Sequence, residues 1–186
     1  MVPATIDLSG AELQLVDVKG RERRLRKALR KYLKNHDVDY VILDCPPSLG
    51  LLTLNALVAA DEVLLPIQCE YYALEGVTQL MRTIEAVRHA MNKELRLGSI
   101  LMTMFDGRTR LSTQVDEEVR THFARETMST RIPRSVRVSE APSYSRSVLT
   151  YEPTSAGAVA YREAAAEFAK RHACDEHSTN TSGVKH

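Results

Sequence analysis

The sequence places a carboxylate directly after a short apolar run, since Tyr40-Val41-Ile42-Leu43 is followed by Asp44. A run without polar alternation is typical of a strand that is buried on both faces of a parallel sheet. A carboxylate at the open end of such a strand can accept hydrogen bonds from the water shell of Mg²⁺, as nucleoside triphosphatases require. Many strands also end in Asp because this residue favours turns, so Asp44 alone leaves a purely structural role open.

Apolar runs alternate with helical patterns along the chain. Strands are predicted at 40–44, 62–67, 99–104 and 128–132, and helices at about 21–34, from near 51, at 74–92, at 111–123, and from 154 or 155 onward. Such alternation predicts βαβ units and an α/β fold of three α-β-α layers around a mostly parallel sheet. Ligands of these sheets bind beyond the carboxyl ends of the strands. We therefore consider Asp44, residues 68–70 and residues 103–109 as candidate site positions.

The helical patterns also predict which side chains are buried. We expect a stripe on helix 74–92 that consists of Val77, Leu80, Met81, Ile84, Val87 and Met91. Helix 111–123 should be capped by Ser112 or Thr113. The last helix should bury Val159, Tyr161, Ala165 and Phe168. Residues 134–150, which combine serines with proline and tyrosine, are predicted to form a functional loop.

Composition limits the class of protein. The chain has 186 residues and a formal net charge of +1, which excludes an acidic disordered protein and a grossly basic nucleic-acid binder. It contains no apolar run of the roughly 18 residues needed to span a membrane. Its three cysteines form no C-x-x-C pair, which favours a reduced, cytoplasmic protein. We predict one domain at 1–172 and a disordered polar tail at 173–186. The basic face of helix 21–34 is either a solvated surface or a phosphate-contacting one.

Several sequence words occur in the order and spacing of one family. They are Asp44-Cys45-Pro46-Pro47-Ser48-Leu49-Gly50, the run from Gln68 to Gly76, Leu101 to Thr109, and Ile132 to Tyr144. Together they resemble the ParA/Soj family of partition ATPases, which are P-loop nucleoside triphosphatases with a deviant Walker A loop. The resemblance extends from Thr5 to about Arg171. It implies a chromosome- or plasmid-partitioning ATPase that uses ATP and Mg²⁺ and forms a homodimer with ATP. The resemblance further implies that the dimer binds DNA non-specifically at the nucleoid and is stimulated by a ParB-like centromere-binding adaptor. Membrane binding is not expected.

The resemblance also assigns roles to individual residues. Asp44 resembles the Walker B carboxylate, which orders Mg²⁺ through water and is the catalytic position. Pro46, Pro47 and Ser48 resemble the switch segment that follows, where two fixed φ angles stiffen the chain. Residues of the adenine and ribose pocket are matched by Thr103, Asp106, Pro133 and Arg134. A strand-end cap and a turn are the structural alternatives for Thr103 and Pro133.

Two arginines match family positions that contact DNA, Arg108 and Arg137. The planar guanidinium pairs with phosphate oxygens through two hydrogen bonds and stays charged, which suits salt-sensitive, sequence-independent binding. A surface ion pair is the alternative role for each of them. Neighbouring residues that could widen the patch are Arg110, Arg131, Arg134 and Arg146. A base-reading motif is absent from the sequence, so we expect no sequence-specific readout.

The glycine-rich loop of the family is not found in this sequence. No G-x-x-x-x-G-K-[ST] word occurs, and the eight glycines do not cluster. Residues 2–12 instead resemble a segment that follows this loop in the family, so we expect a domain truncated at its N-terminus that lacks a βαβ unit of about 30 or more residues. The expected consequence is that the chain alone neither hydrolyses nor tightly binds ATP. The alternatives are a non-catalytic module that binds DNA or a partner, and a structural remnant without activity.

Overall fold

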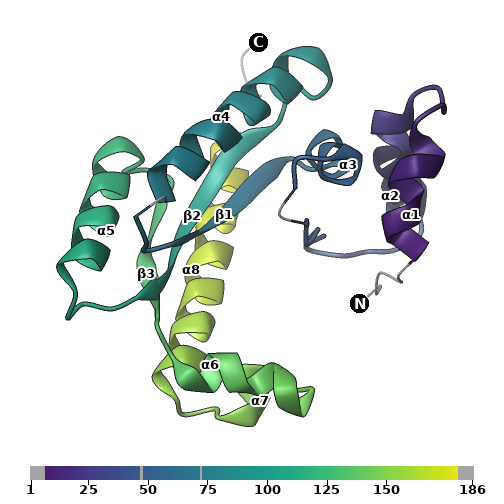
Figure 1. Cartoon of the computed structure of the whole chain (residues 1–186). Coiled ribbons are helices and arrows are strands. Elements are labelled where there is room, and N and C mark those ends of the chain that lie inside the picture. Colours follow the sequence, from purple (N-terminus) through teal and green to yellow (C-terminus); the bar gives the residue numbers. More distant parts are fainter. Residues whose placement is uncertain (1–6, 47, 72, 180–186) are drawn as a thin grey trace. The chain divides into compact units, whose positions relative to one another are not determined.

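The computed structural model describes residues 7–46, 48–71 and 73–179. The chain forms two compact units (Figure 1). One consists of Met1–Val63 with Leu80–Arg96, and the other of Leu64–Gln79 with Leu97–His186. No helix in the described part is long and apolar enough to cross a membrane.

Short helices make up the beginning of the first unit: α1 (Asp7–Leu15), η1 (Arg21–Arg23), α2 (Arg24–Leu33) and α3 (Leu51–Ala59). Gly20 starts η1 with a φ of 66°, a left-handed conformation that glycine adopts without steric cost. The backbone N–H of Leu25 donates to Oδ1 of Asn55 at 3.2 Å, which joins α2 to α3. Glu12 of α1 accepts from the N–H of Leu52 at 3.2 Å. The predicted helices at 21–34 and from 51 are confirmed.

The predicted strand at 40–44 is wrong. These residues have no regular secondary structure, and Val41 and Ile42 are 45% and 81% exposed. A strand forms only where its backbone N–H and C=O groups meet those of a neighbour. Within the described residues the sheet consists of other segments. Apolar composition therefore predicted burial here without supplying the pairing that a strand needs.

The core of the first unit lies between α3 and the end of α4 (Ala73–Ala90). Its buried side chains are Leu57, Val58, Ile84, Val87 and Leu95. Asn92 closes α3, because its side-chain amide donates to the carbonyls of Leu57 and Ala60 at 3.0 and 2.7 Å. The stripe predicted for helix 74–92 is confirmed: three of its members are buried and the other three pack against this core as partly buried side chains.

The sheet has the strand order β1 (Glu62–Gln68), β2 (Arg96–Phe105) and β3 (Thr127–Pro133). Strands β2 and β3 are parallel, with Ile100 opposite Thr127 and Phe105 opposite Pro133. Helix α5 (Arg110–His122) connects β2 to β3, and α8 (Ala156–Thr179) follows later in the chain. The strands predicted at 62–67, 99–104 and 128–132 are confirmed.

Alternation along β3 places helices on both faces of the sheet. Met128 and Ile132 are buried against Ala160 and Ala164 of α8. Arg131, which points to the other face, pairs with a carboxylate of α5. Helices α5 and α8 therefore cover opposite faces of β3 (Figure 1). This arrangement confirms the predicted three-layer α/β fold.

Helix α8 buries a different face from the predicted one. Val159 and Tyr161 are 39% and 37% exposed, and Ala165 is exposed as well. The inward side chains are small: Gly157, Ala158, Ala160 and Ala164, with Phe168 partly buried. A Cβ at Gly157 would lie 2.5 Å from Cγ2 of Val138. Close approach of the helix therefore selects small residues, and this requirement outweighs the preference for burying large ones.

Two further predictions about local structure need correction. Residues 134–150, predicted as a loop, contain α6 (Val136–Glu140), η2 (Ala141–Tyr144) and α7 (Val148–Tyr151), which close over a small core of Ala141, Val148 and Ala158. Helix α5 is capped by Thr109, whose side chain accepts from the N–H of Ser112 at 3.3 Å. Helix α8 continues past 172 to Thr179, and residues 180–186 of the predicted tail lie outside the described residues.

Two side chains of α8 form hydrogen bonds with backbone groups in β3 and just before it. The Glu167 carboxylate accepts from the N–H groups of Ser129 and Thr130 at 2.7 and 2.9 Å. Arg171 pairs with Glu167 at 2.9 Å and donates to the carbonyls of residues 125, 126 and 127. Strand β3 is last in the strand order of the described sheet. Side chains of α8 thus satisfy backbone groups at the beginning of β3, where the pairing of β3 with β2 shifts register.

We expect this contact to make stability depend on pH. Burial opposes ionisation of Glu167, but hydrogen bonds from Ser129 and Thr130 outweigh it and lower its pKa from 4.5 to about 2. A lowered folded-state pKa stabilises above pH 4.5, and this contribution is lost as the pH falls toward 2. Glu167→Gln should therefore lower the free energy of unfolding by roughly 1–2 kcal/mol at pH 7 and weaken its decline in acid. Urea denaturation at several pH values measures both effects.

The matched control is Glu163→Gln, at an exposed position on the same helix. It should leave both the unfolding free energy at pH 7 and its acid dependence unchanged. Equal acid dependence of the Glu167→Gln variant and the wild-type chain would contradict the assignment.

Candidate functional site

The carboxyl end of β2 has an irregular backbone. Its pairing with β3 shifts register between Met102 and Phe105, and Met104 has a φ of 53°. A positive φ at a residue with a side chain is uncommon and marks a point where the chain is held against its preference. On one side of this point the Thr103 hydroxyl donates to the carbonyl of Ile67 at 3.1 Å. On the other side the chain leaves the sheet and leads into the segment that contains Asp106.

Asp106 and Arg108 form a hydrogen-bonded ion pair. Oδ1 of Asp106 accepts from the backbone N–H of Arg108 at 3.1 Å and from its Nε at 2.9 Å, while Oδ2 accepts from Nη2 at 2.8 Å. These hydrogen bonds, from the guanidinium first and the N–H second, lower the pKa of Asp106 to about 2. The Arg108 side chain is nevertheless 90% exposed. The carboxylate therefore orients a guanidinium that still faces solvent.

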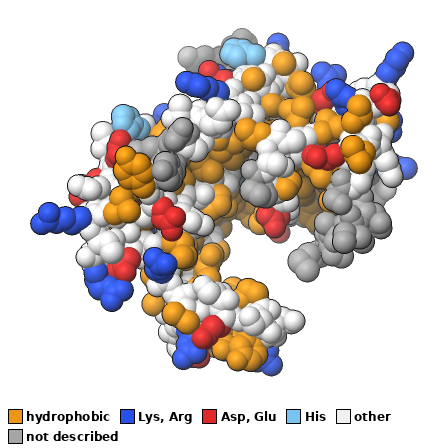
Figure 2. Space-filling model, viewed as in Figure 1, with side chains coloured by type: hydrophobic (Ala, Val, Ile, Leu, Met, Phe, Trp, Pro, Cys, Tyr) orange, Lys and Arg blue, Asp and Glu red, His pale blue; other side chains and the backbone are white. Residues whose placement is uncertain are grey.

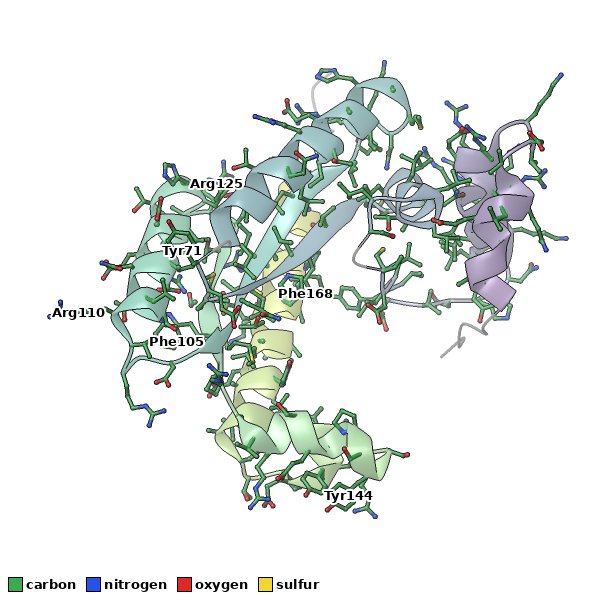
Figure 3. All side chains as sticks on the ribbon, viewed as in Figure 1. Tyr71, Phe105, Arg110, Arg125, Tyr144 and Phe168 are labelled. Carbon is green, nitrogen blue, oxygen red and sulfur yellow. The ribbon has the colours of Figure 1, made fainter. Side chains whose placement is uncertain are left out.

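Arg108 lies beside the start of α5. Gly107, Arg108, Thr109 and Arg110 line a shallow hollow of about 230 Å³ together with Thr113 and Gln114. Figure 3 shows Arg110 projecting outward from this end of the helix. Backbone N–H groups at a helix N-terminus and nearby guanidinium groups both attract anions. The local chemistry therefore suits phosphate oxygens.

Pro133 and Arg134 lie beside this segment. Pro133 is opposite Phe105 in the register of β2 and β3, and the N–H of Arg134 donates to the carbonyl of Phe105 at 2.9 Å. The charge of Arg134 also contributes to the lowered pKa of Asp106. The structure thus brings together four predicted pocket residues, Thr103, Asp106, Pro133 and Arg134, at the ends of two strands.

Sequence reasoning missed the buried carboxylate that supports this end of the sheet. Asp116 of α5, only 3% exposed, accepts from Nε and Nη2 of Arg131 at 3.0 and 2.6 Å and from Nε of Arg120 at 3.0 Å. Burial opposes its ionisation, but these hydrogen bonds outweigh burial and keep its pKa below the ordinary value. The i,i+4 spacing of Asp116 and Arg120 on one helix was the available signal.

This cluster extends to an aromatic ring and a thiol. The guanidinium of Arg131 lies 5.3 Å from the ring centroid of Phe105, which Figure 3 labels at the end of β2. Burial first, and the charge of Asp116 second, raise the pKa of Cys69 to about 11, so this thiol stays protonated and unreactive. Arg131, which was expected to widen a surface patch, is thus committed to a structural ion pair.

Arg137 lies on α6 and is also paired. Its Nη1 donates to Oε2 of Glu140 at 3.0 Å, with side chains 55% and 40% exposed. Exposed pairs of this kind contribute little and exchange readily with solvent. Arg108 and Arg137 therefore share two properties: each guanidinium is exposed, and each is held by one carboxylate.

Asp44, Pro46 and Ser48 belong to the first unit. All three are exposed and lie in a segment without regular secondary structure, and the Ser48 carbonyl accepts from the Thr53 hydroxyl at 2.6 Å. Pro47 lies outside the described residues. The buried strand that was expected to position Asp44 is not present there, so the structure supplies no independent support for its predicted role.

The described residues contain no group of three His, Cys, Asp or Glu side chains that could hold a metal ion. The 186 residues contain no glycine-rich word that could cradle phosphates with backbone N–H groups. Asp44 would contribute one carboxylate, through water, and the pocket residues at the ends of β2 and β3 would contact only the nucleoside part.

Comparison with solved structures supports the fold and links it to nucleotide binding. Cobyrinic acid a,c-diamide synthase from Mycobacterium smegmatis, solved with ADP and magnesium, is 42% identical to this chain with a TM-score of 0.69, covering 87% of this chain and 58% of the synthase. Apo McdA from Cyanthece has a TM-score of 0.71 at 16% identity, covering 88% of this chain and 66% of McdA. At such low identity the second likeness concerns the fold alone.

Curated relatives identify the family. Sporulation initiation inhibitor protein Soj of Bacillus subtilis is 50% identical over 91% of this chain, and chromosome partitioning protein ParA of Myxococcus xanthus is 51% identical over 92%. The chain spans 66% and 60% of the length of these two proteins. A family model described as an AAA domain matches residues 1–97. The chain therefore belongs to the ParA/Soj family of chromosome-partitioning ATPases.

Proposed function

We propose that this chain supplies the DNA-binding part of a ParA-type partition ATPase, with Arg108 and Arg137 as the phosphate contacts. The observation that carries the proposal is the exposed guanidinium of Arg108, oriented by Asp106 beside the start of α5. Such a group can form two hydrogen bonds to a phosphate once it exchanges its carboxylate partner. Binding of this kind neutralises the DNA backbone and does not read its sequence.

The rest of the family's activity is part of the same proposal. In an intact domain, Asp44 would order Mg²⁺ through water, with Pro46, Pro47 and Ser48 as the switch segment. Thr103, Asp106, Pro133 and Arg134 would contact adenine and ribose. ATP-dependent homodimers would bind the nucleoid in the cytoplasm and respond to a ParB-like adaptor. Because the described residues do not make a complete phosphate and Mg²⁺ site, no hydrolytic step is assigned to these 186 residues.

The second candidate function, for the chain taken alone, is that of a non-catalytic module that binds DNA or a partner. The observation that favours it is the combination of exposed arginines with the lack of a metal-holding cluster in the part of the chain that the structure describes. It differs from the first function in one measurable respect, since DNA binding by the module would not depend on nucleotide.

Two measurements on the purified chain test both candidate functions. We expect the purified chain to retain duplex DNA at low salt, to lose it as salt rises, and to show neither ATP turnover nor micromolar affinity for ATP. Filter binding across a salt series, with and without Mg²⁺·ATP, and calorimetric titration with Mg²⁺·ATP provide the two measurements. DNA retention that does not change with nucleotide favours the non-catalytic module. Absence of DNA retention at low salt would refute the DNA-binding proposal, whereas ATP turnover would refute the expectation that these residues cannot form the phosphate site.

A further inference from the structure

Helix α2 carries a dense set of positive charges. Residues 24–34 read RLRKALRKYLK and contain six basic residues and no acidic one. At about 100° of rotation per residue, five of the six fall within an arc of roughly 120°. All five are exposed, and together they form what is called here the α2 basic face: Arg24, Lys27, Arg30, Lys31 and Lys34. Figure 2 shows Lys and Arg side chains projecting from the region of α1 and α2.

The α2 basic face has no acidic partners within residues 7–46, 48–71 and 73–179. None of its five side chains forms an ion pair with another described residue. Elsewhere most buried or half-buried guanidinium groups are paired, as Arg120, Arg131 and Arg171 are. Like charges at i,i+3 and i,i+4 destabilise a helix. The chain as a whole has a net charge of only +1, so this helix concentrates repulsion that an external polyanion would relieve.

The opposite side of α2 is directed toward the protein. Leu25 and Leu29 are partly buried, α2 packs on α3, and the N–H of Leu25 donates to Asn55. The ring of Tyr32 stacks on His36 with centroids 3.8 Å apart. A helix that lies in a membrane interface needs its apolar side for the lipid. On that side Leu25 and Leu29 are partly buried by the protein, while Tyr32 and Leu33 are 50% and 40% exposed. This leaves a small apolar surface for lipid, so the charges favour a water-soluble polyanion over a lipid surface.

Spacing points to a nucleic-acid backbone. Arg24 and Lys34 are ten residues apart, which corresponds to about 15 Å along a helix. One strand of a DNA duplex presents a phosphate about every 3.4 Å along its axis, so this length covers about four of them. We propose that the α2 basic face is a second phosphate-backbone contact for duplex DNA. It is separate from Arg108 and Arg137, which lie in the other unit, and the two can be tested independently.

The test removes charge from the α2 basic face without changing helix propensity. A variant with Lys27→Gln, Arg30→Gln, Lys31→Gln and Lys34→Gln replaces good helix formers with another good one. The control variant, Arg82→Gln with Lys93→Gln, Arg125→Gln and Lys170→Gln, removes the same number of exposed charges elsewhere. Affinity for a short fluorescent DNA duplex is measured by anisotropy across a salt series, and circular dichroism checks that each variant is folded.

We expect the α2 variant to bind DNA at least about tenfold more weakly at low salt and its salt slope to fall by about 2–3, while the control changes both by much less. Lys27→Arg with Lys31→Arg and Lys34→Arg keeps the charge and should retain wild-type affinity. Equal losses in the α2 and control variants, or wild-type affinity of a folded α2 variant, would overturn the proposal. So would α2-dependent binding to phosphatidylserine vesicles without an effect on DNA. A loss confined to Arg108→Ala with Arg137→Ala would overturn this inference and leave the proposed function standing.

Discussion

Replacing Arg108 and Arg137 together with alanine should strongly weaken salt-sensitive DNA retention. Each guanidinium is exposed and held by a single carboxylate, Asp106 or Glu140, so each can transfer to a phosphate at little cost. Loss of two phosphate contacts should reduce the slope of log K against log salt by about 2 and weaken binding at low salt by at least about tenfold. Filter binding at increasing salt concentrations measures both quantities.

A matched variant separates local contacts from a general loss of charge. Arg88→Ala with Arg125→Ala also removes two exposed arginines, one of which is paired with a glutamate three residues away. This variant should keep most of the affinity. Unchanged DNA retention by the Arg108 and Arg137 variant, with its fold intact, would show that these arginines are surface ion pairs and no more.

The second large effect is expected on stability. Asp116→Asn leaves Arg131 and Arg120 without the carboxylate that both contact. Because the side chains of Arg131 and Arg120 are 38% and 28% exposed, hydration of the two guanidinium groups offsets part of the loss. The free energy of unfolding should therefore fall by about 2–3 kcal/mol at pH 7, the lower end of what breaking a buried pair costs. Urea denaturation followed by circular dichroism measures it.

Two further variants identify the cause of this loss. Glu117→Gln, an exposed neighbour on the same helix, should change stability by less than about 0.5 kcal/mol. Arg131→Gln combined with Asp116→Asn should cost less than the two single changes added together, because both remove the same interaction. Additive costs would mean that the carboxylate and the guanidinium stabilise the fold independently, contrary to the observed geometry.

Local patterns predicted the strands of the described sheet and the apolar stripe of α4. Three apolar runs became β1, β2 and β3, and the stripe from Val77 to Met91 is buried or partly buried. Segment 40–44 is also a short apolar run, but it forms no strand. The difference lies in pairing, because hydrogen-bond partners of a strand come from elsewhere in the chain and composition does not reveal them.

The candidate site, like the fold, was predicted from the sequence only in part. Strand-end reasoning selected Thr103 and Asp106, and the family resemblance added Pro133 and Arg134. The structure places all four at the ends of β2 and β3, and their contact with nucleotide stays a prediction. The contacts between residues at these strand ends were not visible in the sequence. Asp106 and Arg108 were assigned to different ligands, and the structure joins them through three hydrogen bonds. Arg131 appeared to be a surface cation, but it reaches a buried carboxylate across the face of β3.

The sequence alone identified the family, the alternation of strands and helices, and the dense charge of α2. These properties depend on short runs of residues and on spacing along one element. Which arginines are paired, which face of α8 is buried and whether 40–44 forms a strand depended on the tertiary structure. These properties arise from contacts between residues that are far apart in the chain. Packing and hydrogen bonding at those contacts override local preference.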